Sequence, residues 1–191
     1  MNTDHKSEKK KIRNFLIDRR NELFLSYEVK NNSYIHIKTL LEELGKCKVG
    51  SYLPFRNEIS TNSIHELLFL LSYEISLPCI DDESKNITFR SWKMEDDLVE
   101  NNYGILQPKE SAGEEEPEMI IVPLVGFSIS GHRLGYGGGY YDRFIEAKKN
   151  TNKIITVGFG YSFQEVHNLP IDSHDQKLNW ILTEKYLYKV T

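Results

Sequence analysis

The sequence predicts a layered α/β domain with a central, largely parallel sheet flanked by helices. Residues 119–124 (MIIVPL) and 153–157 (KIITV) are short apolar runs, a pattern typical of strands buried on both faces. Segments with apolar residues at helical spacing alternate with such runs along the chain. A glycine-rich stretch at 135–139 lies between one of these strands and the next expected helix. Parallel sheets bind ligands in this position, beyond the carboxyl ends of their strands.

Three helices are predicted in the first half of the chain. The second runs through residues 34–44 and stops at Gly45, a residue that often follows a helix C-terminus. The third carries the leucines of 67–71 behind a capping box formed by Ser63 and Glu66. The first helix has an apolar face made of Ile12, Phe15, Leu16, Leu23 and Phe24, and Arg13, Arg19, Arg20 and Glu22 fall elsewhere on it.

The remaining elements are expected to be short. The acidic residues 110–118 are interpreted as a solvated loop, and residues 95–100 as an exposed helical turn. A helix over 140–149 follows the glycine-rich stretch. Strands are expected at 49–53, 75–80, 87–92, 119–124, 153–157, 181–183 and 186–190, which puts the ligand-binding ends at 53–58, 78–82 and 125–139.

Length and composition restrict the possible classes of protein. The 191 residues fit one domain, and since neither a repeat nor a Pro-, Gly- or Ser-rich linker divides them, we expect a single domain over 1–191. An aromatic content of 12% argues against disorder, and a net charge of -4 argues against a strongly cationic nucleic-acid binder. Cys47 and Cys79 form no C-x-x-C motif, so neither a disulfide framework nor a zinc site is expected.

A cytoplasmic location is expected from the apolar pattern. The first eleven residues are polar and charged and lack the apolar segment of a secretory signal. The longest apolar run, at 67–71, is far shorter than a membrane span. We therefore expect no membrane partner.

The segment 131–143, GHRLGYGGGYYDR, carries the clearest chemical signal. Glycines let backbone N–H groups approach a ligand closely, and the helix that begins next adds its own N–H groups, so loop and helix together can bind phosphate. Arg133 can add a charged contact to phosphate, and Asp142 can hold a magnesium ion that bridges phosphates. The segment is not a Walker A loop, because Gly-Lys-Ser/Thr is missing, and it is not G-x-G-x-x-G, because Tyr140 takes the place of the last glycine.

Together with residues 122–127 (VPLVGF), this segment closely resembles the signature of the 5-formyltetrahydrofolate cyclo-ligase family, whose members are also called 5,10-methenyltetrahydrofolate synthetases. The resemblance covers most of the chain. Lys9-x-x-x-Arg13 resembles the basic motif of the family's first helix, and residues 52–61 resemble its strand-to-helix segment with a glutamate. Further similar segments, in the same order as in the family, are 77–78, 103–108, 169–175 and 183–184.

The resemblance implies a Rossmann-like fold and an ATP- and magnesium-dependent conversion of 5-formyltetrahydrofolate to 5,10-methenyltetrahydrofolate. In this reaction the formyl oxygen is phosphorylated, N10 attacks, and phosphate leaves as the ring closes. A monomer that binds ATP and a reduced folate, without nucleic acid, is expected. Many members have Arg where this chain has Tyr136, so its loop carries one fewer cation.

The matching motifs also imply the site residues. The residues implied to bind ATP are Lys9, Arg13, Arg133, Leu134, Gly135, Tyr136, Gly137, Gly138, Gly139, Tyr140 and Tyr141. The residues implied to bind the substrate are Arg13, Leu53, Glu58, Tyr136, Gly137, Gly138, Gly139 and Tyr140. Tyr140 and Glu58 are the implied catalytic residues, and Asp142 and Asp175 are the implied magnesium ligands.

Other interpretations stay open on the residues alone. Each charged residue taken singly is also explained as a solvated surface group, and the glycines as a structural turn. A sugar-phosphate isomerase or coenzyme A transferase relative would use the same loop for phosphate without any need for ATP. An RNA-binding module would use the tyrosines of 136–141 for base stacking.

Overall fold

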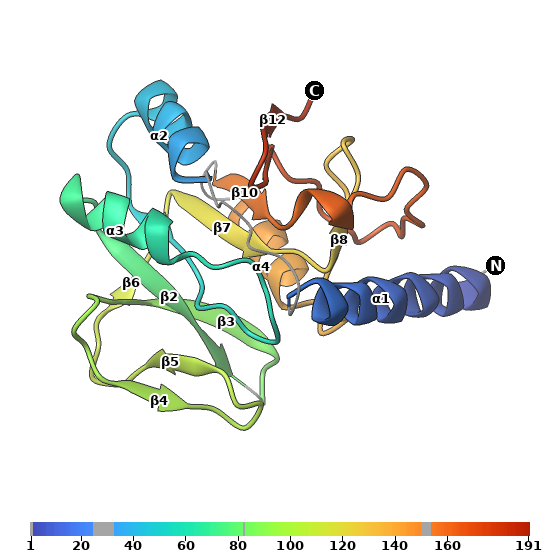
Figure 1. Cartoon of the computed structure of the whole chain (residues 1–191). Helices are drawn as coiled ribbons and strands as arrows, with labels where there is room; N and C mark the ends of the chain where they lie inside the picture. Colours follow the sequence, from blue (N-terminus) through green and yellow to red (C-terminus); the bar gives the residue numbers. More distant parts are fainter. Residues whose placement is uncertain (1, 25–32, 82, 150–153) are drawn as a thin grey trace.

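A computed structural model of the chain describes residues 2–24, 33–81, 83–149 and 154–191. The centre of the molecule is a sheet of eight strands in the order β12-β11-β10-β7-β1-β2-β3-β6 (Figure 1). These strands are β1 (Val49–Gly50), β2 (Ile75–Asp81), β3 (Asn86–Ser91), β6 (Glu114–Glu115), β7 (Met119–Pro123), β10 (Ile155–Phe159), β11 (Trp180–Leu182) and β12 (Leu187–Lys189).

The middle of the sheet is parallel and its edges are antiparallel. Within the described residues, β11, β10, β7, β1 and β2 pair in parallel, whereas β12 at one edge and β3 near the other run the opposite way, and the edge strand β6 pairs antiparallel with β3. The apolar run 119–124 supplies β7, which is flanked by β1 and β10. This arrangement confirms the predicted α/β fold with a largely parallel sheet.

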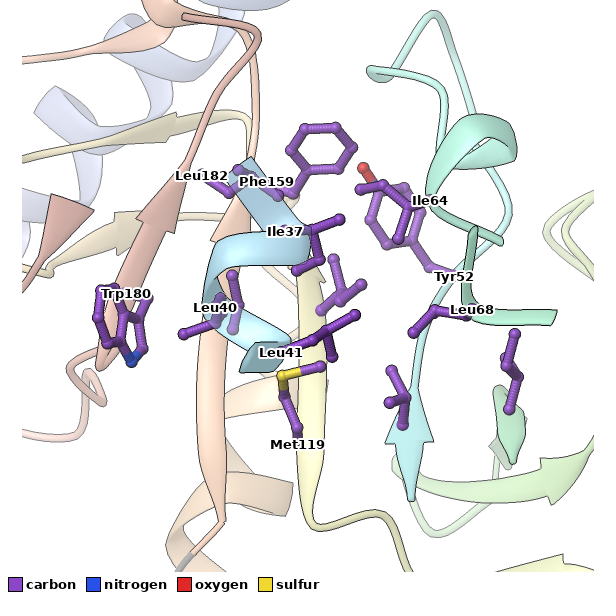
Figure 2. Packing of buried hydrophobic residues seen from close by; sticks show 14 of the residues in the cluster. Ile37, Leu40, Leu41, Tyr52, Ile64, Leu68, Met119, Phe159, Trp180 and Leu182 are labelled. Carbon is purple, nitrogen blue, oxygen red and sulfur yellow. The ribbon is translucent and has the colours of Figure 1, made fainter. Parts of the chain in front are cut away.

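Helices cover both faces of the sheet. On one face lie α2 (Ser33–Leu44) and α3 (Asn62–Leu70), and α2 buries Ile37, Leu40 and Leu41 against a cluster that includes Met119 and Phe159 of the sheet (Figure 2). On the other face, α4 (Tyr140–Lys149) packs over a second cluster that contains Phe89, Ile120 and Ile145.

Gly50 is required in β1, which lies between β2 and β7, because side chains of β3 and β7 crowd it. A Cβ atom on Gly50 would lie 2.7 Å from Phe89 Cε1 and 2.9 Å from Ile120 Cγ2, closer than atoms of a packed core approach. The missing side chain lets β1 occupy the centre of the sheet, and the loop that follows β1 leads directly into the candidate site.

The long helix α1 (Asn2–Phe24) lies beyond the carboxyl ends of the central strands, beside the hairpin of β8 (Gly126–Phe127) and β9 (Arg133–Leu134) (Figure 1). The predicted apolar face of this helix is confirmed for Leu16 but wrong for Phe15, and Arg20, which was predicted to lie elsewhere, is on the inward face. Leu16 is buried, but Phe15 is 63% exposed, whereas Arg20 is 1% exposed. The inward face contains Lys9, Arg13, Leu16 and Arg20 at helical spacing, because the helix packs against a polar site rather than against the apolar core.

Other local predictions also need correction. The capping box is wrong: α3 begins at Asn62, so Ser63 lies inside the helix, and the N-cap Thr61 donates its hydroxyl to the Tyr52 carbonyl at 2.8 Å. The predicted helical turn at 95–100 is wrong as well. Its last three residues form β4 (Leu98–Glu100), which pairs with β5 (Leu106–Pro108), since strand pairing satisfies more backbone groups than one exposed turn.

The acidic stretch 110–118 is more ordered than a solvated loop. Its middle forms β6 against β3, and Lys48 Nζ lies 2.6 Å from Glu115 Oε2. The strand expected at 49–53 is shorter than predicted and ends at Gly50. The helix over 140–149 is confirmed, and so are strands in the other expected segments. Residues 82 and 153 and the side chain of Phe24 lie outside the description. No helix of the described segments is long and apolar enough to cross a membrane.

Candidate active site

The cations on the inward face of α1 contact two different segments beyond the sheet. Lys9 contacts the loop before β11, Arg13 contacts the glycine-rich loop 135–139, and Arg20 contacts Tyr136 of the same loop. We call Lys9, Arg13 and Arg20 the cationic face of α1. Segments that are more than 100 residues apart in the sequence thus meet at one end of the sheet.

Lys9 lies between two aspartates. Its Nζ donates to Asp172 Oδ2 at 2.7 Å and to Asp175 Oδ2 at 2.5 Å. Burial lowers the pKa of Lys9, but the hydrogen bonds to both carboxylates outweigh burial and raise the pKa above its ordinary value. Ligand atoms of Asp172, His174 and Asp175 lie within 4.8 Å of one another. These oxygen and nitrogen donors suit a divalent cation, and the ammonium group of Lys9 shows that they attract positive charge.

The glycine-rich loop is held directly by α1. Arg13 Nε donates to the Gly135 carbonyl at 2.7 Å. Gly137 has φ +101°, and a Cβ atom on it would lie 3.4 Å from Arg13 Nη2. Gly139 also has a positive φ, +70°, immediately before α4 begins. The loop needs these glycines because L-residues with side chains rarely adopt such angles.

Arg133 is buried and already paired. Its Nη2 donates to Asp142 Oδ1 at 2.7 Å, and its Nη1 donates to the carbonyl of Gln176. Asp142 Oδ1 also accepts the Gln176 N–H at 3.0 Å. Burial lowers the pKa of Arg133, and the charge of Asp142 opposes that shift. Of the two predicted magnesium ligands, Asp175 belongs to the group around His174, whereas Asp142 lies outside that group and pairs with Arg133.

Glu58 is a buried acid at the end of the loop after β1. It is 6% exposed, and its Oε2 accepts the Phe55 N–H at 2.9 Å. Burial raises the pKa of Glu58 to about 7, against the opposing effects of the Phe55 N–H, the charge of Arg20 and the Tyr136 hydroxyl. The predicted folate contact Leu53 is part of this loop and packs partly buried against the larger core cluster.

Arg20 is the site residue that the sequence did not single out. Its Nη2 donates to Tyr136 Oη at 2.5 Å, and its guanidinium carbon lies 5.8 Å from the centre of that ring. A signal was present, since Lys9, Arg13, Leu16 and Arg20 are spaced i, i+4, i+7 and i+11 and therefore share a helix face. Arg20 also places a cation beside Tyr136, the position at which the sequence predicted one cation fewer in the loop.

Comparison with known proteins agrees with this geometry. Residues 5–184 match the model of the 5-formyltetrahydrofolate cyclo-ligase family. The chain belongs to this family. The 5-formyltetrahydrofolate cyclo-ligase of Haemophilus influenzae is 32% identical over 152 residues, which cover 77% of this chain and 81% of that protein. The enzyme of the same name from Escherichia coli K12 is 30% identical over 146 residues, 74% of this chain and 80% of the other.

A solved structure supports the assignment. The NMR structure of Aquifex aeolicus 5,10-methenyltetrahydrofolate synthetase superimposes with a TM-score of 0.75 and 28% identity, covering 95% of this chain and 92% of that one. Family membership makes the chain an ATP-dependent ligase of folate one-carbon metabolism. This result confirms the resemblance and decides against the isomerase and transferase hypotheses.

Two tyrosines predicted as site residues lie at the start of α4. Tyr140 Oη lies 3.2 Å from Tyr103 Oη, which connects the start of α4 to the turn between β4 and β5. Burial raises the pKa of Tyr141, whose hydroxyl is influenced by the charges of Glu58 and Arg133. Both tyrosines pack against the second core cluster, so their backbone is anchored while Tyr140 extends toward the hairpin.

A separate cavity lies away from these residues. It has a volume of about 520 Å³ and opens where β1 and β2 begin, among residues that include Lys48, Tyr73, Trp92 and Met94. The predicted site residues line the opposite end of the strands, so this cavity plays no part in the assignments above.

Proposed function

We propose that the chain converts 5-formyltetrahydrofolate to 5,10-methenyltetrahydrofolate in two chemical steps, phosphorylation and ring closure. The observation that carries the proposal is the contact of the cationic face of α1 with the glycine-rich loop. Arg13 donates to the Gly135 carbonyl, and Gly137 lies beside the Arg13 guanidinium, so positive charge and exposed glycines occur on one surface. A triphosphate needs this combination.

The formyl oxygen attacks the γ-phosphorus of ATP, the bond to the bridging oxygen breaks, and ADP leaves. N10 of the folate then attacks the activated carbon, loses its proton, and phosphate leaves as the carbon–oxygen bond breaks. Glu58, with a pKa of about 7, is suited to accept a proton near neutral pH. The rest of the site contributes positioning and charge stabilisation.

The site residues divide between the two substrates. We assign ATP to Lys9, Arg13, Arg133 and residues 134–141, because Arg13 contacts the glycine-rich loop, Lys9 shares its helix face, and Arg133 immediately precedes the loop. We assign the folate to Leu53, Glu58 and the tyrosine side of the loop, where Tyr136 and Tyr140 are partly exposed. Arg13 and residues 136–140 lie between the two and serve both substrates.

Asp142 and Asp175 are the proposed magnesium ligands. Within the described residues, both hydrogen bonds to Asp142 end on Oδ1, which leaves Oδ2 for coordination. Asp175 lies with Asp172 and His174 in a set of donors that fits a divalent cation. Magnesium bound to phosphate oxygens would neutralise their charge. For Asp175 to bind it, Lys9 must move toward the phosphates.

The test is a direct assay with the full chain, 5-formyltetrahydrofolate and magnesium-ATP, in which the methenyl chromophore and ADP are measured together. Equal amounts of both products support the proposal. ADP without chromophore, or no product from folded protein, would refute it. We also propose that residues 1–191 act as a monomeric single domain. Light scattering on a size-exclusion column tests the monomer, and a single cooperative unfolding transition tests the domain.

A further inference from the structure

Arg20 is a buried cation with unused hydrogen-bond donors. Its side chain is 1% exposed, yet Nε and Nη1 have no hydrogen-bond partner among the described residues. Leaving a buried polar donor unpaired costs about 1–3 kcal/mol, and more when the group is charged. Natural proteins satisfy nearly all such groups. An arginine in this state is therefore expected to have a partner that binds during function.

The surroundings of Arg20 indicate what that partner is. Tyr136, which accepts its Nη2 donor, belongs to the glycine-rich loop assigned to ATP. Glu58, whose pKa its charge influences, belongs to the loop assigned to the folate. Arg20 thus lies where the two proposed subsites meet. The anionic group that crosses from one substrate to the other is the phosphoryl group.

The other cations of the site already have protein partners. Lys9 is bonded to two aspartates, Arg13 to the Gly135 carbonyl, and Arg133 to Asp142 and a carbonyl. Among these four residues, Arg20 is the most deeply buried. In such surroundings a guanidinium group stabilises phosphoryl charge more strongly than at an exposed site.

We propose that Arg20 is a catalytic residue whose unpaired N–H groups bind the phosphoryl group while it passes from ATP to the formyl oxygen. This inference rests on the proposed function. The interaction is made during transfer, so its loss lowers kcat and leaves ground-state binding of either substrate nearly unchanged. From the effect of removing one such stabilising group elsewhere, we expect a fall in kcat of about 100- to 1,000-fold.

The experiment compares Arg20→Gln with Arg19→Gln, which removes the same charge from the neighbouring, exposed arginine. For Arg20→Gln we expect the loss in kcat with both KM values within about threefold of wild type, and for Arg19→Gln we expect wild-type kinetics. Orthovanadate with ADP and 5-formyltetrahydrofolate serves as the probe of the phosphoryl position. Arg20→Gln should weaken vanadate inhibition at least tenfold and leave ADP binding unchanged.

Each other outcome overturns the inference. A higher KM for either substrate at unchanged kcat would make Arg20 a ground-state binding residue, and unchanged kinetics would make it dispensable. If Arg20→Gln does not fold, Arg20→Lys decides, since it keeps the charge but not the planar set of donors. A folded, fully active Arg20→Lys refutes the proposal, and a folded, slow one supports it. If wild type itself yields no methenyl product, the proposed function fails rather than the role of Arg20.

Discussion

The buried carboxyl group of Glu58 leads to a prediction about stability. Its pKa of about 7 lies above the ordinary 4.5 because burial disfavours the charged form. The folded protein therefore holds this proton more tightly than the unfolded chain does, and unfolding releases it. The free energy of unfolding must fall as the pH rises from about 4.5 to about 7, and the whole loss is present above 7.

The size of the effect follows from the two pKa values. At about 1.36 kcal/mol for each pH unit, the interval from 4.5 to about 7 corresponds to roughly 3 kcal/mol. Glu58→Gln removes this penalty, because an amide oxygen still accepts the Phe55 N–H and has no charge to bury. The free energy of unfolding of Glu58→Gln minus that of wild type should therefore be about 3 kcal/mol larger at pH 8.5 than at pH 4.5. For a chain of this size this corresponds to a relative shift in Tm of roughly 6–12 °C.

The assay is urea unfolding of wild type and Glu58→Gln at several pH values between 4.5 and 8.5. Only the pH dependence of the difference is used, so effects of the substitution that do not depend on pH cancel. Glu66→Gln, which changes an exposed glutamate of α3, is the control and should show a constant difference. A constant difference for Glu58→Gln too would refute the reasoning, because Glu58 would then ionise equally easily in both states.

Three further predictions concern α1 and the aspartates. Lys9→Met should raise the affinity for Mn²⁺ without nucleotide by about tenfold, measured by calorimetry, because the ammonium no longer competes for the carboxylates. Leu16→Ala should cost about 2–4 kcal/mol in denaturant unfolding, whereas Phe15→Ser should change stability by less than about 0.5 kcal/mol. Asp142→Asn should lower turnover at limiting magnesium and, because Arg133 loses its carboxylate, lower the free energy of unfolding by about 3 kcal/mol.

The elements that were predictable are those whose burial shows in local composition. The run 119–124 is apolar throughout because β7 is covered on both faces, and 140–149 combines helical spacing with a glycine-rich start. Residues 95–100 contain no such signal. Their structure depends on pairing with β5, a contact with a later segment that local propensity does not describe.

The site residues that belong to a sequence motif were predictable, whereas the contacts and orientations that packing determines were less so. The glycines, Arg133 and Asp142 follow from the segment 131–143, but their ion pair comes from the fold. Orienting α1 by hydrophobicity alone places Arg20 away from the apolar face. That assumption fails for a helix that packs against a polar site, whose inward side chains are charged.

The docking of α1 against the rest of the protein depends more on polar contacts within the site than on burial of apolar side chains. Leu16 is the one large apolar side chain fully buried among its described residues, so little of its attachment comes from the hydrophobic effect. Its inward cations instead use two aspartates, a carbonyl and a tyrosine hydroxyl, and Arg20 retains donors without partners. Anionic substrates would satisfy these donors, and a ligand that binds the folded state stabilises it. The buried charge of α1 reduces stability while its donors lack partners. The same charge therefore favours the docked position of α1 once ATP and folate are bound.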